Sequence, residues 1–450
     1  MTTKIAENKQ AAFTTGSTMR HVIVMTSTAS VGLVSIFFVD LLNLFYISWL
    51  GDQALTAAIG YASTVMFFSL SICIGLMIAT SALVGRAIGK GEADRAKILA
   101  TSSLVFTGIF TTVFAISVYP FLPWFLSTLG ARGETFDHAL GFMRIVVPSI
   151  PFMGLGMCFG GLLRAKGDAK RSMFVTLSGG VTALVLDPIF IFGFDLGITG
   201  AAITVFIVRI VLVVIGYWGA QGVHKMLGRY DRPAALRQMR PFFTIAIPAI
   251  ITQLATPFGN AYVTQAIAEF GDSAVAGWAI IGRILPVAFG TLFALSGAVG
   301  PILSQNFGAA LFSRVNQTLK DAMVFTMIYG LVVWALLALF SPWIVSMFSA
   351  TSEAASLVQL FCTLVAGSFL FNGALFVANA SFNNLGFPLY ATFFNWGRAT
   401  LGVIPFVMIG KAYGAEGVLM GWGLGAVIFG VSGAITAFYV TKKLGNNVQT

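Results

Sequence analysis

The stretch WLGDQALTAAIG at residues 49–60 has a counterpart 220 positions later, EFGDSAVAGWAI at residues 269–280. Both copies place Gly-Asp just before a run of small and apolar residues. A spacing of this size is far longer than one helix, so the chain contains two copies of a large structural unit.

A second pair of segments extends the repeat. LDPIFIFGFDLGITGAAI at 186–203 parallels IPFVMIGKAYGAEGVLMG at 404–421, and Pro188 then aligns with Pro405. Between the two copies the sequence predicts an even number of membrane crossings, so both halves share one orientation. Parallel repeats in transporters form two lobes related by a pseudo-twofold axis along the membrane normal.

The composition identifies an integral membrane protein. The 450 residues are 57% hydrophobic and 9% charged, and the mean hydropathy is +0.90, whereas a soluble domain has about 25% charged residues. Apolar runs of about 20 residues, the length of a membrane-spanning helix, recur along the whole chain. They predict twelve spans at about 20–48, 54–85, 97–127, 138–163, 171–193, 198–220, 242–268, 274–305, 317–347, 354–382, 388–410 and 417–441.

The basic residues predict the topology. With the N-terminus inside, 20 of the 26 lysines and arginines fall in inside segments, and the outside loops hold only Arg132 and Lys411. A lysine and arginine excess marks the cytoplasmic side, so both termini are expected in the cytoplasm. The net charge of +10 therefore reflects topology rather than a nucleic-acid site.

The predicted fold is all-helical, with two six-helix lobes in the lipid bilayer. We expect a first lobe at 1–221, a cytoplasmic linker at 222–241 and a second lobe at 242–450. We expect the protein to be a monomer.

Two of the sixteen acidic residues, Asp40 and Asp187, fall well inside the predicted spans. The other fourteen fall in loops, tails or span ends, and Asp321 is among those at a span end. A charge at the bilayer centre costs roughly 2.5–3.5 kcal/mol on insertion scales, so such residues are functional candidates. Asn43 lies on the face of Asp40, and Pro188 directly follows Asp187 and frees a backbone carbonyl. Each carboxyl suits a coupling-ion site; the alternative is a structural hydrogen bond to a neighbouring helix.

The repeat places this acid chemistry in one lobe. The position equivalent to Asp40 is Asn260, and the position equivalent to Asp187 is Ile404. The second lobe therefore repeats the architecture without the two carboxylates.

Several motifs resemble the MATE family (multidrug and toxic compound extrusion), most closely its DinF-like branch. They are FFVDLLNLFYISWLGDQALTAAIG (37–60), LRAKGDAKR (163–171), LDPIFIFGFDLGITGAAIT (186–204), GDSAVAGWAIIGRI (271–284) and ILSQNFGA (302–309). Their order and the repeat cover nearly the whole chain. The resemblance implies efflux of amphipathic, often cationic drugs or toxins, driven by an H⁺ or Na⁺ gradient without a cofactor.

The resemblance also implies site residues. The acids of the first and fifth helices match Asp40 and Asp187, which would hold H⁺ or Na⁺ without any structural metal. A helix-6 threonine matches Thr204, although a threonine there often bonds its own helix instead. The chain departs from the family where some members have an asparagine one turn before the helix-5 acid, because Ala183 stands at that position.

Other residues are candidates for a substrate cavity. Members of the family's NorM-like branch have acids in helices 7 and 10. The corresponding spans of this chain, 242–268 and 354–382, offer only amides, so a carboxylate ion site in the second lobe is disfavoured. Arg283 and Arg398 lie deep in the predicted spans 274–305 and 388–410. Each either hydrogen-bonds backbone carbonyls or contacts substrate. The cavity candidates besides Asp40 are Gln253, Asn260, Asn372, Asn379, Arg283, Phe37, Met66, Phe67 and Phe289.

Three other functions compete with antiport. Arg283 and Arg398 keep open a flippase for lipid-linked saccharides, against which the two acids weigh. A membrane enzyme would need a catalytic or metal cluster, yet the three histidines all lie near span ends. A passive channel fits poorly with a two-lobe repeat and isolated acids.

Overall fold

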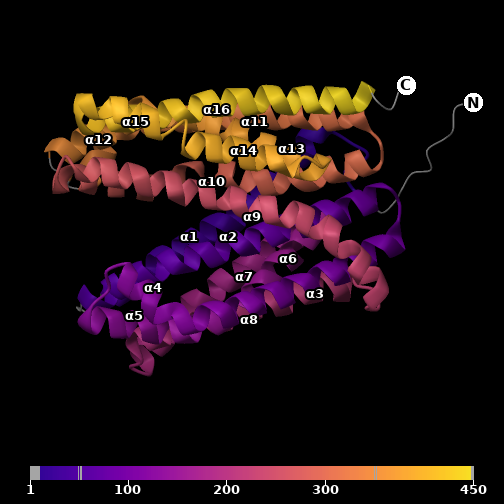
Figure 1. Ribbon diagram of the computed structural model, residues 1–450, viewed down its shortest axis with the longest axis horizontal. Coiled ribbons are helices and arrows are strands. Elements are labelled where there is room, and N and C mark those ends of the chain that lie inside the picture. The colour runs from indigo at the N-terminus through magenta and orange to yellow at the C-terminus, as the bar shows by residue number, and fades with distance from the viewer. Residues whose placement is uncertain (1–10, 49, 51–52, 349, 351, 447–450) are drawn as a thin grey trace, which may run out of the picture. The chain divides into compact units, whose positions relative to one another are not determined.

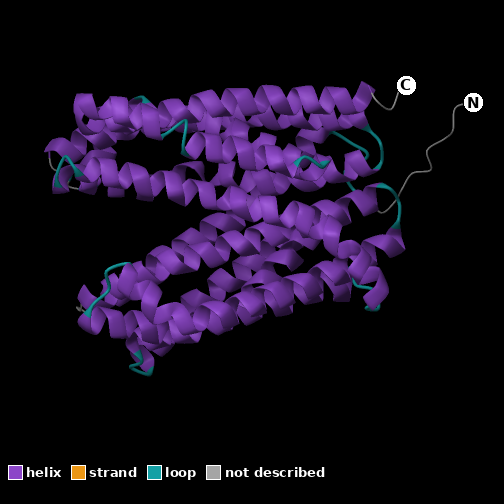
Figure 2. Ribbon diagram, viewed as in Figure 1, coloured by secondary structure: helices purple, strands orange, loops and turns teal. Residues whose placement is uncertain are grey.

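A computed structural model describes residues 11–48, 50, 53–348, 350 and 352–446, without the side chains of 38–41, 44, 45, 48, 53 and 352. These residues form helices joined by short loops, with no strand among them (Figure 2). Eleven described segments have the length and apolar composition of a membrane span. The last of them, Pro388–Asn446, contains two of the predicted spans. The all-helical multispan prediction is confirmed.

The chain divides into two compact units. The described part of the first unit is residues 31–250, which we call the N-lobe. The second unit, the C-lobe, is residues 11–30 and 251–450. The division falls inside two helices, α1 (Thr18–Ser48) and α9 (Arg232–Ala268).

The N-lobe is a bundle in which α2 packs on α3 and α6, and α8 packs on α6 and α7 (Figure 1). Gly156 on α6 allows the close approach of α8, because a Cβ there would lie 2.7 Å from Cβ of Leu212. Small residues have this role in many membrane helix pairs. The lobe's complete helices are α2 (Gln53–Gly89), α3 (Ala93–Val118), α4 (Leu122–Thr128), α5 (Gly133–Val146), α6 (Ile150–Lys166), α7 (Ala169–Pro188) and α8 (Gly197–Tyr217).

Proline interrupts three of the predicted N-lobe spans, one of them at the 3₁₀ turn Tyr119–Phe121 between α3 and α4. After Pro188, α7 continues as a π-helical turn, Ile189–Gly193, as expected where a backbone donor is missing. Between α5 and α6 a short 3₁₀ turn, Val147–Ser149, breaks the span. Arg209 of α8 supplies hydrogen bonds at this break. Its guanidinium donates to the carbonyl of Val146 (3.0 Å) and to the hydroxyl of Ser149 (2.7 Å).

The C-lobe is also helical, and its last helices are in close backbone contact. A Cβ on Gly425 of α16 would lie 1.8 Å from the carbonyl oxygen of Gly402, so only glycine fits there. The lobe's complete helices are α10 (Asp272–Gly308), α11 (Phe312–Met347), α12 (Ser352–Thr363), α13 (Phe369–Leu385), α14 (Pro388–Ala399), α15 (Ile404–Gly410) and α16 (Gly414–Asn446).

The segment before α1 is docked on the C-lobe. Phe13 is 3% exposed, and its amide donates to Oε1 of Gln305 at 2.9 Å. Its carbonyl accepts from Nδ2 of Asn306 (3.2 Å) and from Nη2 of Arg314 (2.9 Å). The beginning of α1 therefore belongs structurally to the C-lobe, although the rest of the helix belongs to the N-lobe.

Candidate ion-binding site in the N-lobe

Asp187 lies in the last turn of α7, and its side chain is buried, with 1% exposed. The amide of Asn43, on α1, donates to its Oδ2 at 3.1 Å. Within the described part of the chain, Oδ1 has no hydrogen-bond partner. Half of this carboxyl is therefore satisfied and half is buried without a partner.

Thr204 faces the same carboxyl from α8. Its side chain is 1% exposed, and its hydroxyl lies near Asp187 but outside hydrogen-bonding geometry. The hydroxyl makes no hydrogen bond to any described residue, so the expected bond within its own helix is not formed. Two buried oxygens from neighbouring helices are thus available to a ligand.

Helix α1 supplies the third side of this site. Tyr46, one turn beyond Asn43, packs edge-on against Phe192 with ring centroids 6.0 Å apart, which fixes α1 against the π-helical turn after α7. Asp40 lies one turn before Asn43 on α1, and its side chain is outside the described residues. The spacing of three residues places Asp40 and Asn43 on one helical face.

The chemistry of this arrangement suits a small cation. A buried carboxylate that lacks hydrogen-bond partners costs free energy. In native proteins a bound ion, a water molecule or a proton usually compensates such a group. A proton on the carboxyl would supply a donor, and Na⁺ would be coordinated by the carboxylate and hydroxyl oxygens that meet here. The site thus offers oxygen ligands and little else, as hard cations require.

Comparison with known proteins gives the family. A model described as MatE matches the chain twice, over residues 28–189 and again over residues 248–409. The chain belongs to the MATE family. This family consists of membrane transporters rather than enzymes, and the two matches coincide with the internal repeat.

Known MATE proteins are similar over nearly their whole length. The FAD transporter of Shewanella oneidensis is 26% identical over 427 residues, covering 93% of each chain. The multidrug export protein MepA of Staphylococcus haemolyticus is 23% identical over 412 residues, covering 91% of this chain and 90% of that protein. A crystal structure of a mutant of the Vibrio cholerae MATE transporter VcmN has a TM-score of 0.89 and 26% identity, covering 95% of this chain and 97% of that chain.

The amide candidates all belong to the C-lobe. Asn372 and Asn379 are buried on α13, at 4% and 8% exposed, and Oδ1 of Asn379 has no partner among the described residues. Gln253 and Asn260 are half-buried on α9. They stay predictions as cavity residues.

The two deep arginines differ in environment. Arg398 is 6% exposed and donates to the hydroxyl of Thr256 at 2.9 Å, while its Nε has no partner in the described part of the chain. Arg283 is exposed and lines an apolar groove of about 460 Å³ between α10 and α11. Arg398 is thus a packed structural residue, and Arg283 is accessible.

The apolar cavity candidates also divide. Phe289 is fully buried in the C-lobe core, stacked on Phe369 with centroids 4.6 Å apart. A role for Phe289 in a substrate cavity stays a prediction. Phe37 and Met66 are half-buried, and Phe67 is 42% exposed.

Sequence reasoning missed two polar clusters. Asp321, expected at a span end, is the tenth residue of α11, is 8% exposed, and accepts hydrogen bonds from Thr18 and Gln317. The sequence signal for it was a carboxylate one helical turn after a glutamine.

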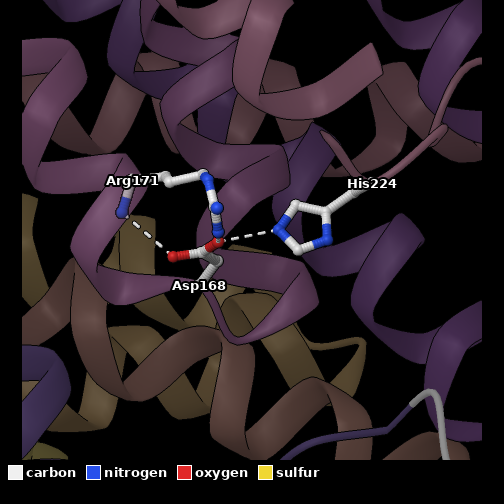
Figure 3. Close-up of polar contacts among 3 residues, drawn as sticks. All are labelled: Asp168, Arg171 and His224. Atoms are coloured by element: carbon white, nitrogen blue, oxygen red, sulfur yellow. Dashed lines mark hydrogen bonds and ion pairs between the residues drawn. The ribbon is translucent and has the colours of Figure 1, made fainter. Parts of the chain in front are cut away.

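The second cluster joins Asp168, Arg171 and His224 at the other end of α7 (Figure 3). Asp168 caps α7, accepting from the amide of Arg171 at 3.0 Å. Burial acts to raise the pKa of the Asp168 carboxyl, but hydrogen bonds from Arg171 and His224 outweigh burial and hold it below its ordinary value. An aspartate followed three residues later by a basic residue, within LRAKGDAKR, was the available signal for a helix start.

Proposed function

We propose that the protein is an ion-coupled antiporter that exports amphipathic, often cationic compounds, with Asp187, Asn43, Thr204 and Asp40 holding the coupling ion. The observation that carries the proposal is the Asp187 carboxyl, buried with Oδ1 unpartnered among the described residues and beside a second unpartnered oxygen. MepA, a relative over nine-tenths of the chain, is a multidrug export protein.

The proposed cycle uses charge neutralisation. An external H⁺ or Na⁺ occupies the acid pair, weakens its attraction for a cationic substrate and releases that substrate outside. One charge crossing about 100 mV supplies about 2.3 kcal/mol. At about 1.4 kcal/mol per tenfold, that sustains a substrate gradient of roughly 50-fold.

The test is dye transport in proteoliposomes under a pH gradient or an Na⁺ gradient imposed separately. Asp187→Asn and Asp40→Asn should abolish ion-driven transport while the protein remains folded. Asp195→Asn is the matched control, because Asp195 is an exposed loop acid in a left-handed conformation that asparagine tolerates. Full ion-driven transport by both site variants would refute the coupling assignment, and the gradient that drives wild type identifies the ion.

We propose the bacterial inner membrane as the location, with cytoplasmic termini and a monomeric protein. The basic residues support this orientation. The segment before α1 and the end of α16 also reach the same end of the C-lobe, at the start of α11. Arg314 bonds the carbonyl of Phe13, and a Cβ on Gly445 would lie 3.5 Å from Cβ of Phe312.

A second candidate substrate is a flavin dinucleotide, since the FAD transporter of Shewanella oneidensis matches 93% of this chain. FAD is anionic, so it would need a cation such as the exposed Arg283. Flavin counterflow in the same proteoliposomes, with wild type and Arg283→Gln, separates the two substrates. A flippase for lipid-linked saccharides is disfavoured by the MatE match.

A further inference from the structure

Two helices of the C-lobe, α10 and α11, pack against each other and leave an apolar groove of about 460 Å³ between them. One side of the groove is the segment of α10 from Arg283 to Ala288, and the other is the last half of α11, from Tyr329 onwards. Each side contains a proline, Pro286 in α10 and Pro342 in α11. Proline removes one helical hydrogen bond and commonly kinks a helix, so a weakened turn lies on each side of the groove.

The lining of this groove is apolar apart from a few side-chain tips. The hydroxyl of Tyr329 donates to the carbonyl of Ala288 at 2.9 Å, so it does not offer its proton to a ligand. A surface of this kind fits a hydrocarbon chain, and the groove volume is in the range of about 300–1,000 Å³ that ligand sites have. Its large exposed apolar residues are Val287, Leu336, Phe340, Trp343 and Met347.

Arg283 is the one charged residue among the described residues that line the groove. It is exposed, and it forms no hydrogen bond or ion pair with any described residue. A charged side chain inside a membrane span is rare and normally has a partner, so this guanidinium calls for an anion. The described acids of the C-lobe, none of which lines the groove, are Glu269, Asp272, Asp321, Glu353 and Glu416.

Helix length places Arg283 near one surface of the bilayer. Helices α10 and α11 have 37 and 36 residues, so each is about 55 Å long, against a hydrocarbon core of about 30 Å. An upright helix of this length extends about 13 Å beyond the core at each end. Arg283 lies about 16 Å from the start of α10 at Asp272, which is only about 4 Å inside the core. A snorkelling arginine side chain covers such a distance and reaches the headgroups.

The lining residues of α11 continue this order from headgroups to bilayer centre. Trp343 is close to the end of α11 at Met347, at the headgroup level where tryptophan is enriched. Tyr329 lies about 27 Å from the same end, which is close to the bilayer centre. The groove therefore spans one leaflet. With the termini in the cytoplasm, as proposed above, α10 begins outside and this is the outer leaflet.

We propose that the groove binds one anionic phospholipid, with the phosphate on Arg283 and an acyl chain lying between α10 and α11 towards Tyr329. A guanidinium donates two parallel hydrogen bonds to phosphate oxygens, and basic pockets between membrane helices bind anionic headgroups in other proteins. The groove belongs to the C-lobe alone, so this site is separate from the Asp187 site and goes beyond the proposed antiport. A bound lipid occupies Arg283 and keeps it from an anionic substrate.

The first experiment titrates the purified, delipidated protein with single phospholipids and follows bound lipid by native mass spectrometry. Wild type should bind one phosphatidylglycerol at least tenfold more tightly than phosphatidylcholine. Arg283→Gln should lose this preference, because it removes charge-assisted bonds to the headgroup, whereas Arg283→Lys keeps the charge and should retain it. The matched control is Arg144→Gln, since Arg144 is also exposed and lies at the same distance from the start of its helix, α5 at Gly133, but outside the groove. It should bind as wild type.

The second experiment fills the groove and leaves Arg283 in place. Val287→Trp adds a large side chain at an exposed lining position and should weaken phosphatidylglycerol binding at least tenfold, because the acyl chain loses its space. Leu339→Trp is the matched control, because Leu339 is an exposed residue of α11 outside the lining, and it should have no effect. Thermal unfolding of each variant checks that the fold is kept.

Three results would overturn the proposal. Wild type might bind both phospholipids equally, a site variant and its control might have the same effect, or Val287→Trp might leave lipid binding unchanged. A dimer in the mass spectrum that Val287→Trp dissociates would assign the groove to a second copy of the chain, which also excludes the lipid.

Discussion

Arg314 clamps the segment before α1 onto the C-lobe, and its replacement should release that segment. The guanidinium donates to the carbonyls of Phe13 (2.9 Å), Thr15 (3.1 Å) and Gly16 (3.0 Å), and to Oδ1 of Asn306 (3.0 Å). Arg314→Met keeps an apolar stem of similar length and removes all four donors. The segment should then undock without unfolding the lobe.

The magnitude follows from the exposure of each bond. The bonds to Thr15 and Gly16 are exposed, so water replaces them at a cost of about 0.5 kcal/mol each. The bond to Phe13 is partly buried and contributes about 1 kcal/mol. The bond to Asn306 joins α11 to α10 within the C-lobe, so its loss affects the docked and undocked states equally. The total of about 2 kcal/mol corresponds to a roughly 30-fold rise in the undocked population.

Hydrogen exchange at the Phe13 amide is the direct assay, because that amide is buried and donates to Gln305. Arg314→Met should accelerate its exchange by roughly 30-fold, since exchange follows the population of the open form. Lys320→Met is the matched control, because Lys320 is an exposed cation on the same helix. Unchanged exchange in Arg314→Met, or equal acceleration in the control, would refute the clamp.

Three further predictions concern stability. Gly425→Ala places a Cβ 1.8 Å from the carbonyl oxygen of Gly402 and should lower the free energy of unfolding by about 1–3 kcal/mol or more, measured by denaturant unfolding. The control is Gly282→Ala, which has open space around it and should leave stability unchanged. Arg209→Met leaves buried acceptors between α5 and α6 unpaired and should lower stability by about 1–3 kcal/mol, seen as a lower melting midpoint than wild type. Asp168 has a pKa in the folded state below its unfolded value, so the stabilisation that its carboxylate contributes is present above about pH 4 and is lost as the pH falls through the folded pKa. Between about pH 6 and pH 3, the thermal unfolding midpoint should therefore fall less in Asp168→Asn than in wild type.

The sequence predicted the membrane spans and the candidate acids because both depend on local composition. A run of apolar residues and a carboxylate inside it are visible without tertiary structure. The repeat extended this to two related halves, which the double MatE match supports. The missing proline donor indicated a freed backbone carbonyl near Pro188, and the structure has a π-helical turn directly after it.

The partners of these residues were not predictable, because they come from other helices. Helical spacing placed Asn43 beside Asp40, yet its amide donates a hydrogen bond from α1 to Asp187 on α7. Phe289 and Phe67 are equally apolar, but one is buried in the C-lobe and the other is 42% exposed. In a membrane protein both lipid and core accept apolar side chains, so the sequence lacks the contrast that identifies a buried face in water.

The division of α1 and α9 between two units has a mechanical consequence. In α1 the border follows Ser30, whose buried hydroxyl bonds the carbonyl of Thr26 at 2.7 Å, a contact that often bends membrane helices. In α9 the border follows Pro248 by two residues, and proline removes one helical hydrogen bond. Relative movement of the units is therefore expected to bend these helices at their weakened turns. The start of α1 is held by Arg314 in the C-lobe, and Asn43 further along the same helix bonds Asp187 in the N-lobe, so one helix joins the clamp to the buried carboxyl.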